Sequence, residues 1–384
     1  MKLAFVIFKF FPHGGLQLDF RRIAIECLKR GHKITVYTRE WNGPALAGVE
    51  LEIINAKGFS NHAKAVSFER LVLSELANNP PGLTVGFNRM GGLDVYFAAD
   101  NCFATESAAT AGFKRFFTNR YRIYRAMEEK VFTPDAKTAI MYLTERQKKD
   151  FIDTYGTPDE RFHLLPPGIE EDRKPPEDPA KIISIRNAVR SEFQIRPDEF
   201  LLIQVCSGFA TKGVDRTLQT IAVIPSEIPV RLLIAGRDSS NRFNKLAEAL
   251  KLSNRVIFAG GRDDIGDLLL AADLMIHPAR KEATGTVLIE GLTAGLPMIC
   301  SSVCGYEDIV VSAGGVVLAE PFHQDTWNKA VIELLQNPEG LKTMREKIVN
   351  YAASVNFYER PKVAAEIIEH HARKVCNEQS YSSE

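Results

Sequence analysis

The chain has 384 residues, of which 45% are hydrophobic and 25% charged, values typical of a globular protein. Its 48 basic and 48 acidic residues cancel, which argues against a nucleic-acid-binding protein, because such proteins usually carry a basic excess. The length exceeds one ordinary core, so we expect two domains. No apolar run reaches the roughly 18 residues of a membrane-spanning helix, and the apolar N-terminus is read as a strand, not as a signal peptide.

The first part of the chain alternates strands and helices. Residues 3–8 are a short apolar run, and residues 16–32 follow with the apolar spacing of a helix. Further strands are expected at residues 33–40, 49–56, 83–88, 95–100 and 138–144. Strands joined by crossover helices imply a parallel sheet. Residues 162–179 are rich in proline and charge and are predicted to be a linker.

A second alternating series follows this linker. Its strands are expected at residues 200–206, 230–236, 256–261, 274–279, 298–303 and 315–320. The predicted fold class is therefore α/β, with two doubly wound Rossmann-like domains facing across a cleft, where ligands meet the carboxyl ends of strands. We expect an N-terminal domain over residues 1–168, a C-terminal domain over residues 169–355, and a final helical segment, residues 356–384, that packs back on the first domain.

The loop "FKFFPHGG" joins the first strand to the first helix. Gly14 and Gly15 allow a close backbone approach and positive φ angles, and the helix that follows offers free N–H groups to an anion. The G-x-G-x-x-G fingerprint of dinucleotide-binding enzymes is absent, which disfavours a nicotinamide dehydrogenase. The alternative is a tight turn that binds nothing.

The stretch "HPARKEATGTVLIEGLTAGLP" (residues 277–297) contains two glutamates eight positions apart. Glu282 lies on a loop after a strand, and Glu290 lies inside a helix whose expected cap is Thr284 or Thr286. Carboxylates accept paired hydrogen bonds from vicinal sugar hydroxyls, and a helix N-terminus favours a phosphate. The spacing therefore favours a nucleotide sugar as ligand; two solvated surface charges are the alternative.

These motifs, in this order, resemble the retaining glycosyltransferases of family four, which have the GT-B fold. The resemblance rests on "EATGTVLIE" followed by "AGLP", on "PHGG" in the first loop and on "KGVD" after the first strand of the second domain. The segments "GLDVYFAADNCF", "LPPGIEEDRK" and "CGY" are similar, more narrowly, to the lipopolysaccharide core glucosyltransferases of that family. The resemblance extends from about residue 1 to residue 375.

The resemblance implies an α-retaining hexosyltransferase that uses a UDP-hexose and an inner-core heptose of lipopolysaccharide. It implies glucose as the hexose, with galactose or an N-acetylhexosamine left open, and no cofactor. No D-x-D motif occurs in the chain, so no metal is expected. The alternatives are a GT-B sugar-nucleotide epimerase, a phosphorylase with a pyridoxal phosphate lysine, a non-catalytic nucleotide-sugar sensor, and a transferase with another lipid-linked or glycan acceptor.

The resemblance also assigns donor contacts. It implies that Glu290 holds the ribose, that Glu282 is a catalytic residue near the hexose, and that Lys212 neutralises the leaving phosphates. Arg173 is expected to replace an arginine that is missing before Lys212, and position 211, a threonine, is left out of the set. The predicted donor-binding residues are Gly14, Gly15, Arg173, Lys212, Glu282, Thr284, Gly285, Thr286, Val287 and Glu290.

Two aspartates of the first domain are further candidates. Asp100 closes the strand at residues 95–100, and we expect it to act in catalysis or to orient the substrate. Its alternative role is an N-cap for the segment that follows. Asp19, in the first helix, is predicted to contact the acceptor.

Residues 112–132 interleave basic and aromatic side chains, a composition that suits an anionic lipid surface. The predicted membrane contacts are Lys114, Arg115, Phe116, Phe117, Arg120, Tyr121, Arg122, Tyr124 and Arg125. An ordinary amphipathic surface helix is the alternative. With a lipid-linked acceptor, this surface implies a cytoplasmic protein that is peripheral on the inner membrane.

Overall fold

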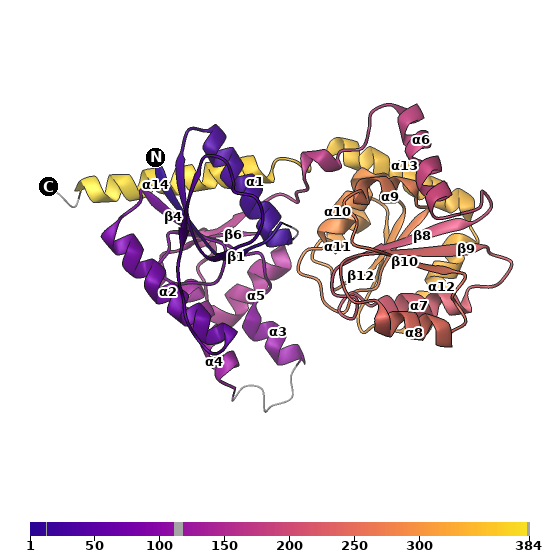
Figure 1. Cartoon of the computed structure of the whole chain (residues 1–384), viewed down its shortest axis with the longest axis horizontal. Helices are drawn as coiled ribbons and strands as arrows, with labels where there is room; N and C mark the ends of the chain where they lie inside the picture. Colours follow the sequence, from indigo (N-terminus) through magenta and orange to yellow (C-terminus); the bar gives the residue numbers. More distant parts are fainter. Residues whose placement is uncertain (13, 111–117, 382–384) are drawn as a thin grey trace. The chain divides into compact units, whose positions relative to one another are not determined.

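The computed structural model describes residues 1–12, 14–110 and 118–381 and separates into two compact units. Unit 1 comprises Met1–Pro166 and Glu359–Glu384, and unit 2 comprises Pro167–Tyr358 (Figure 1). Each unit is built on one parallel sheet, so the expected class of two doubly wound α/β domains is confirmed. The unit boundaries fall at residues 166 and 358, where the sequence analysis placed them at 168 and 355.

The sheet of unit 1 has seven parallel strands in the order β3-β2-β1-β4-β5-β6-β7. They are β1 (Lys2–Phe10), β2 (Lys33–Trp41), β3 (Val49–Ile53), β4 (Leu83–Gly86), β5 (Val95–Phe97), β6 (Ala139–Tyr142) and β7 (Phe162–Leu164). The sequence analysis missed β7 and assigned its residues to the linker. This edge strand has three residues and is followed directly by prolines, so it shows almost no periodicity.

The helices of unit 1 include the last helix of the chain. They are α1 (Gly15–Lys29), α2 (Asn61–Asn78), α3 (Phe103–Thr110), α4 (Asn119–Phe132), α5 (Glu145–Tyr155), the 3-10 turn η2 (Asp159–Arg161) and α14 (Arg360–Tyr381). α14 packs against α1 and β4 (Figure 1). Its small and branched residues Ala364, Ala365 and Ile368 are buried in the same core as Phe5 and Phe20. The C-terminal helix therefore completes the core of the first unit.

An ion pair inside unit 1 ties the beginning of α14 to α1. Arg360 is only 1% exposed, and its Nη1 lies 3.1 and 3.0 Å from the two carboxylate oxygens of Asp19. Its Nε donates to the carbonyl oxygen of Pro166 at 2.9 Å. Arg22 contacts the same Asp19 carboxylate from one turn further along α1, at 2.5 Å. A buried carboxylate needs such partners, because an unpaired buried charge is strongly destabilising.

The sheet of unit 2 has six parallel strands in the order β10-β9-β8-β11-β12-β13. They are β8 (Phe200–Val205), β9 (Val230–Ala235), β10 (Val256–Gly260), β11 (Leu274–His277), β12 (Met298–Ser301) and β13 (Val316–Leu318). The helical segments of this unit are η3 (Glu171–Arg173), α6 (Pro179–Glu192), α7 (Val214–Val223), α8 (Asn241–Ala249), α9 (Ile265–Ala271), α10 (Thr286–Thr293), α11 (Glu307–Ser312), α12 (Gln324–Leu335) and α13 (Pro338–Ser354).

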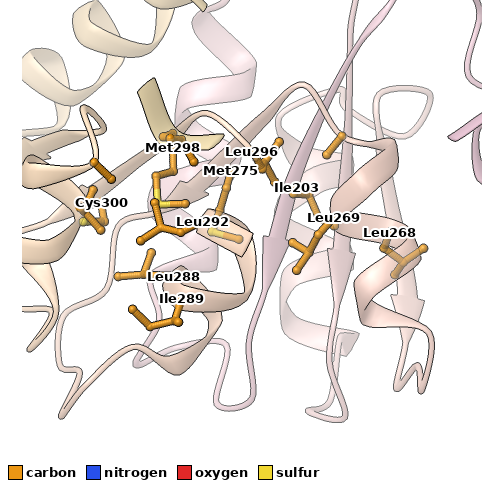
Figure 2. Packing of buried hydrophobic residues seen from close by; sticks show 14 of the residues in the cluster. Ile203, Leu268, Leu269, Met275, Leu288, Ile289, Leu292, Leu296, Met298 and Cys300 are labelled. Carbon is orange, nitrogen blue, oxygen red and sulfur yellow. The ribbon is translucent and has the colours of Figure 1, made fainter. Parts of the chain in front are cut away.

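Helix α10 is fixed by its buried side. Leu288, Ile289 and Leu292 pack with Met275 of β11 and Met298 of β12 in one cluster (Figure 2). A Cβ added at Gly291 would lie 2.8 Å from the Met275 side chain and 2.9 Å from that of Met298, so the helix backbone lies close to the sheet. The helical repeat turns position 290 away from this core. Packing thus sets where the second glutamate of the pair points.

Among the described residues, no helix has both the length and the apolar character needed to cross a bilayer.

Candidate active site

The first candidate site of unit 2 lies where its strand order reverses, at the carboxyl ends of β8 and β11. Two loops meet there, residues 206–213 and 278–285. The Arg280 backbone N–H donates to the Thr211 carbonyl at 2.8 Å, and the Arg280 guanidinium holds Asp215 through two contacts of 2.7 Å. A Cβ at Gly213 would lie 2.1 Å from the Pro278 carbonyl oxygen. The two loops therefore form one rigid support.

Three titratable side chains, Lys212, Glu282 and His277, lie in a row next to these two loops. The Lys212 ammonium lies 2.8 Å from Oε2 of Glu282, and Nε2 of His277 lies 3.1 Å from the same oxygen. Lys212 also donates to the carbonyl oxygen of Lys281 at 3.1 Å. His277 is 1% exposed, whereas the side chains of Glu282 and Lys212 keep 13% and 18% of their surface. The ammonium thus forms the solvent-facing end of a partly buried row.

The charge states of this row follow from its surroundings. Burial raises the pKa of Glu282, but hydrogen bonding and attraction to His277, then Lys212, outweigh it and lower the pKa to about 2. Burial lowers the pKa of His277, but interactions with Cys304 and Glu282 outweigh it and raise the pKa to about 9. The Glu282 carboxylate is therefore an anion at neutral pH, held between Lys212 and His277.

The expectation that a threonine caps the start of α10 is wrong. The N-cap is Gly285, at φ 86° and ψ 51°, and no side chain caps the helix, so neither Thr284 nor Thr286 fills that role. Positive φ favours glycine at this turn. The two threonine hydroxyls lie 3.5 Å apart, and a Cβ at Gly285 would come within 3.4 Å of the Glu282 side chain. The free N–H groups of the first turn thus lie next to Glu282. Val287, also predicted to bind the donor, is partly buried at this turn.

Glu290 belongs to a second group of contacts. Its Oε1 lies 3.9 Å from Nε of Arg173, and Nη1 of Arg173 donates to the Asp263 carbonyl at 3.1 Å. Both residues line a small cavity of about 50 Å³. Arg173 is expected to replace the arginine that is missing before Lys212; in the structure its contacts are with Glu290, in the middle of α10, and with the Asp263 carbonyl, and its contact with a donor stays a prediction.

Unit 1 carries a separate pocket of about 310 Å³ at the carboxyl ends of β1, β4 and β5. This edge includes the point where the strand order of unit 1 reverses. The pocket has an apolar wall and a polar wall and is lined by Val6, Phe8, Ala65, Phe68, Asn88, Arg89, Met90, Asp100, Phe103, Arg120, Tyr124 and Met127. Of the predicted catalytic residues, Asp100 is the one that lines it.

The alternative role of Asp100, as a helix cap, is taken by another residue. The buried carboxylate of Glu128 accepts hydrogen bonds from the backbone N–H groups of Phe103 (2.8 Å) and Ala104 (3.1 Å) at the start of α3. The Asp100 carbonyl oxygen accepts from Nε2 of Gln147 at 2.7 Å. The backbone at Asp100 is thereby anchored, while its exposed side chain lines the pocket.

The glycine loop of unit 1 differs from expectation in its conformation. Gly14 is the N-cap of α1 at φ −90°, and Gly15 is not among the glycines with positive φ, so a left-handed backbone is not what requires glycine here. A Cβ at Gly14 would lie 1.9 Å from the Gln17 side chain, whereas a Cβ at Gly15 would meet nothing within 4 Å. A side chain at position 14 would therefore require Gln17 and Phe11 to move, whereas position 15 has open space.

The remaining predicted residues are placed as follows. Asp19 is engaged by Arg360 and Arg22, as described above.

Tyr121 is 8% exposed and packs on Phe103 with ring centroids 5.6 Å apart, so its ring is not presented to solvent. Arg125 pairs with Glu129 at 2.9 Å. Arg120 and Arg122 are exposed, and Tyr124 is partly buried. Lys114, Arg115, Phe116 and Phe117 lie outside the described residues.

Sequence reasoning missed His277 and Glu128. His277 ends a strand directly before Pro278, five residues ahead of Glu282, and a titratable residue at the end of a buried strand was the available signal. Nothing in the sequence marks Glu128 among the other charges of its helix. Within residues 1–12, 14–110 and 118–381, no cluster of three or more histidine, cysteine or acidic residues has a geometry that could hold a metal ion.

Two Rossmann-like units, each with a candidate site at the carboxyl ends of its strands, are the architecture of the GT-B fold, and the comparisons with known proteins identify the class as glycosyltransferases. Residues 185–355 match the family model described as glycosyl transferases group 1. The chain is 41% identical to lipopolysaccharide glucosyltransferase WaaG of Escherichia coli K12, over 96% of this chain and 98% of that protein. The chain therefore belongs to the glycosyl transferases of group 1.

Solved structures agree with this family. The crystal structure of WaaG, a glycosyltransferase involved in lipopolysaccharide biosynthesis, is similar with a TM-score of 0.90 over 95% of this chain and 99% of that chain, at 41% identity. HepE of Anabaena, in complex with UDP and glucose, is similar with a TM-score of 0.73 over 97% of this chain and 100% of that chain. At 16% identity, the second likeness shows the fold alone.

Proposed function

We propose that this glycosyltransferase moves a hexose, glucose, from a UDP-sugar to an inner-core heptose of lipopolysaccharide, with retention of the α configuration. The observation that carries the proposal is the glutamate pair: Glu282, on the loop before α10, lies beside Lys212, and Glu290, within α10, lies beside Arg173. The 41% identity to a lipopolysaccharide glucosyltransferase over nearly the whole chain supports the hexose and the acceptor.

On the donor side, Glu290 accepts the ribose hydroxyls and Glu282 lies at the hexose. Lys212 and the free N–H groups of α10 stabilise the charge that develops on the departing diphosphate, as fixed donors and cations do at such sites. In this mechanism the acceptor hydroxyl attacks from the face that the diphosphate leaves, and a phosphate oxygen takes the proton of that hydroxyl. No covalent nucleophile and no metal are needed.

On the acceptor side, we assign the pocket of unit 1 to the sugar acceptor. Its apolar wall, including Phe8, Phe68 and Met90, suits the C–H face of a sugar ring, and its polar wall suits hydroxyl groups. Asp100 is the exposed carboxylate of that wall and orients the attacking hydroxyl. Asp19, predicted to contact the acceptor, is buried and paired with Arg360 and Arg22 and does not line this pocket, so we leave it out of the acceptor site.

A lipid-linked acceptor would bring the protein to the cytoplasmic face of the inner membrane as a peripheral protein. Arg120 and Arg122 supply exposed positive charge at the start of α4. Changing both to Ser should weaken sedimentation with anionic vesicles at low salt, at roughly 1 kcal/mol per basic residue. Arg242→Ser/Lys245→Ser, on the exposed side of α8, is the matched control. Equal sedimentation of the two double variants would contradict the lipid contact.

The activity is tested by a donor screen on a heptose-terminated core acceptor. UDP-glucose, UDP-galactose and UDP-N-acetylglucosamine are offered in turn, and the product is read by mass and by the anomeric configuration of the new bond. We expect one added glucose in α linkage. Epimerised donor formed without acceptor would instead indicate an epimerase, and UDP-sugar binding without transfer or hydrolysis would indicate a sensor.

A further inference from the structure

Asn88 is a polar residue of the unit 1 pocket that neither the sequence analysis nor the proposed mechanism uses. It lies two residues beyond the end of β4, the strand that pairs with β1 on one side and with β5 on the other. Asp100 follows β5, and the register pairs Gly86 of β4 with Tyr96 of β5, so the two loops leave the sheet side by side. Both residues line the pocket, and a sugar bound there would meet both.

A hydrogen bond from the backbone fixes the orientation of the Asn88 side-chain amide. Oδ1 of Asn88 lies 2.6 Å from the backbone nitrogen of Phe8, near the end of β1. A backbone N–H can only donate, so the amide atom that faces it must be the oxygen. A residue 80 positions away along the chain thus holds the amide in one orientation, with Nδ2 on its other branch.

The amide nitrogen of Asn88 keeps its two donor hydrogens for a ligand. Among the contacts of residues 1–12, 14–110 and 118–381, none engages Nδ2. The side chain is partly exposed, and Nδ2 is not sealed from solvent. Because the space that Asn88 borders is the pocket of about 310 Å³, this donor is available to a molecule bound there.

The next residue of the polar wall, Arg89, is held by the protein itself. Its Nε lies 3.0 Å from Oε1 of the buried Glu128, and its Nη2 donates to the carbonyl oxygen of Asn101 at 2.5 Å. Arg89 therefore ties the loop after β4 to the turn that carries Asp100. The wall is fixed by these contacts, while the neutral donor of Asn88 remains unspent.

A donor and a carboxylate in one pocket match two adjacent hydroxyls of a sugar. In the proposed mechanism, the Asp100 carboxylate accepts a hydrogen bond from the hydroxyl that attacks. The attacking oxygen needs a lone pair for the new bond, and a hydrogen bond donated to it would lower its nucleophilicity. The donor of Asn88 therefore suits the oxygen of the neighbouring hydroxyl and not the attacking oxygen.

We propose that Asn88 is an acceptor-binding residue, which donates a hydrogen bond from Nδ2 to the hydroxyl that flanks the attacking hydroxyl of the acceptor sugar. The assignment rests on the proposed function, the transfer of a hexose to a heptose-terminated acceptor. It gives the pocket a means to recognise the pattern of hydroxyls beside the site of attack, because a carboxylate alone reads one of the two positions.

The first test exchanges the donor for an acceptor of the same shape. Asn88→Asp keeps an oxygen for the Phe8 N–H and places a second oxygen where Nδ2 was. With UDP-glucose and the heptose-terminated core acceptor, we expect the KM for the acceptor to rise about tenfold, or about 1.4 kcal/mol. Asn88→Ala, which removes the donor without adding charge, should raise it about threefold. UDP affinity should stay unchanged in both variants, because Asn88 belongs to unit 1.

The control adds the same charge nearby without touching the pocket wall. Asn61→Asp places a carboxylate at the exposed start of α2, the helix whose Ala65 lines the pocket. The KM for the acceptor and the affinity for UDP should both stay at the values of the parent.

Acceptors that lack one hydroxyl separate recognition from a structural effect. The linkage of the parent's product identifies the attacking hydroxyl, and the hydroxyls on either side of it are removed in turn. For one of the two deoxy acceptors, the KM of the parent should rise about threefold, whereas Asn88→Ala should not distinguish that acceptor from the intact one. The two changes remove the same hydrogen bond, so their effects should not add.

The contrary outcomes are distinct. A parental KM for the acceptor in Asn88→Asp and Asn88→Ala would overturn the assignment, as would deoxy acceptors that affect the parent and Asn88→Ala equally at both positions. A parallel loss of UDP affinity would mean a packing defect and would also overturn it. If Asn88→Asp does not fold, Asn88→Ala decides. A parent that transfers no hexose to this acceptor would overturn the proposed function, and the assignment with it.

Discussion

The candidate sites of the two units are built in opposite ways. In unit 2, Lys212, Glu282 and His277 satisfy one another, and the loops that carry them are locked together by Arg280 and Asp215. In unit 1, the candidate carboxylate Asp100 is exposed on the wall of a pocket of about 310 Å³. A site of paired charges on interlocked loops suits a compact nucleotide that is the same in every turnover. An open pocket with one apolar wall suits a larger glycan.

The largest expected effect separates chemistry from donor binding. Asp100→Asn should lower the single-turnover transfer rate by about 10²–10⁴, the range for a lost polar catalytic group, because the amide cannot accept as the carboxylate does. UDP affinity should stay near that of the parent, since Asp100 belongs to unit 1. Near-normal transfer by this variant would remove Asp100 from the catalytic residues.

The next effect concerns stability and unit 1 alone. Arg360→Leu leaves the Asp19 carboxylate with Arg22 as its remaining cation among the described residues, and breaking a buried pair from one side typically costs about 3–5 kcal/mol. Lys149→Leu, which removes the exposed pair of Lys149 with Asp153 in α5 of the same unit, should cost at most about 1 kcal/mol. Urea denaturation of the two variants measures both costs, and equal losses would show that burial does not distinguish the pairs.

Glu290→Ala tests the second contact group of unit 2. Losing a charged hydrogen-bond acceptor for the ribose should cost about 1.5–3 kcal/mol, or about one to two decades of UDP affinity. Deoxyuridine diphosphate, which lacks one ribose hydroxyl, should lose less affinity than UDP on the same change. An unaltered titration of UDP would mean that Glu290 does no more than pair with Arg173.

The smallest expected effect is a difference between the two units in how their stability depends on pH. In unit 1, Nε2 of His163 and Nε2 of His371 lie 2.9 Å apart; burial, then His163 and Lys374, lowers the pKa of His371 from 6.5 to about 4. The unfolded chain therefore binds more protons there, and stability is lost as pH falls from 6.5 towards 4. In unit 2, the pKa of His277 is raised to about 9, so its contribution is present below pH 6.5 and is lost as pH rises to 9.

Unfolding by urea from pH 4 to pH 9.5 measures this contrast through differences from the parent. Removing the acid-sensitive group in His371→Gln should flatten the acid side of the stability profile and leave the alkaline side unchanged. His277→Gln should do the reverse. Profiles that run parallel to the parent's over the whole range would contradict the assigned charge states.

The sequence predicted the order of the elements and the placement of the glutamates, Glu282 on a loop and Glu290 in the next helix, because both are local patterns. Alternating apolar runs identify the strands, and Glu282 and Glu290 lie within one loop and helix. The contacts that define the sites come from distant segments. Lys212 reaches Glu282, and Glu128 reaches the start of α3, and the order of residues in a single sequence carries no record of such contacts. The N-cap at Gly285 was missed because threonines are the better caps by propensity, and the turn required positive φ.

The return of α14 to unit 1 bears on how the protein is made. The core of unit 1 contains Ala364, Ala365 and Ile368, which follow the whole of unit 2 in the chain. At roughly 5–20 residues per second, a ribosome needs roughly 10–40 s to add unit 2. During that time the first unit has its strands but lacks its covering helix, and the apolar surface beneath α14 is open. Unit 2, which is continuous in sequence, can complete its core first, so the order of folding should reverse the order of synthesis.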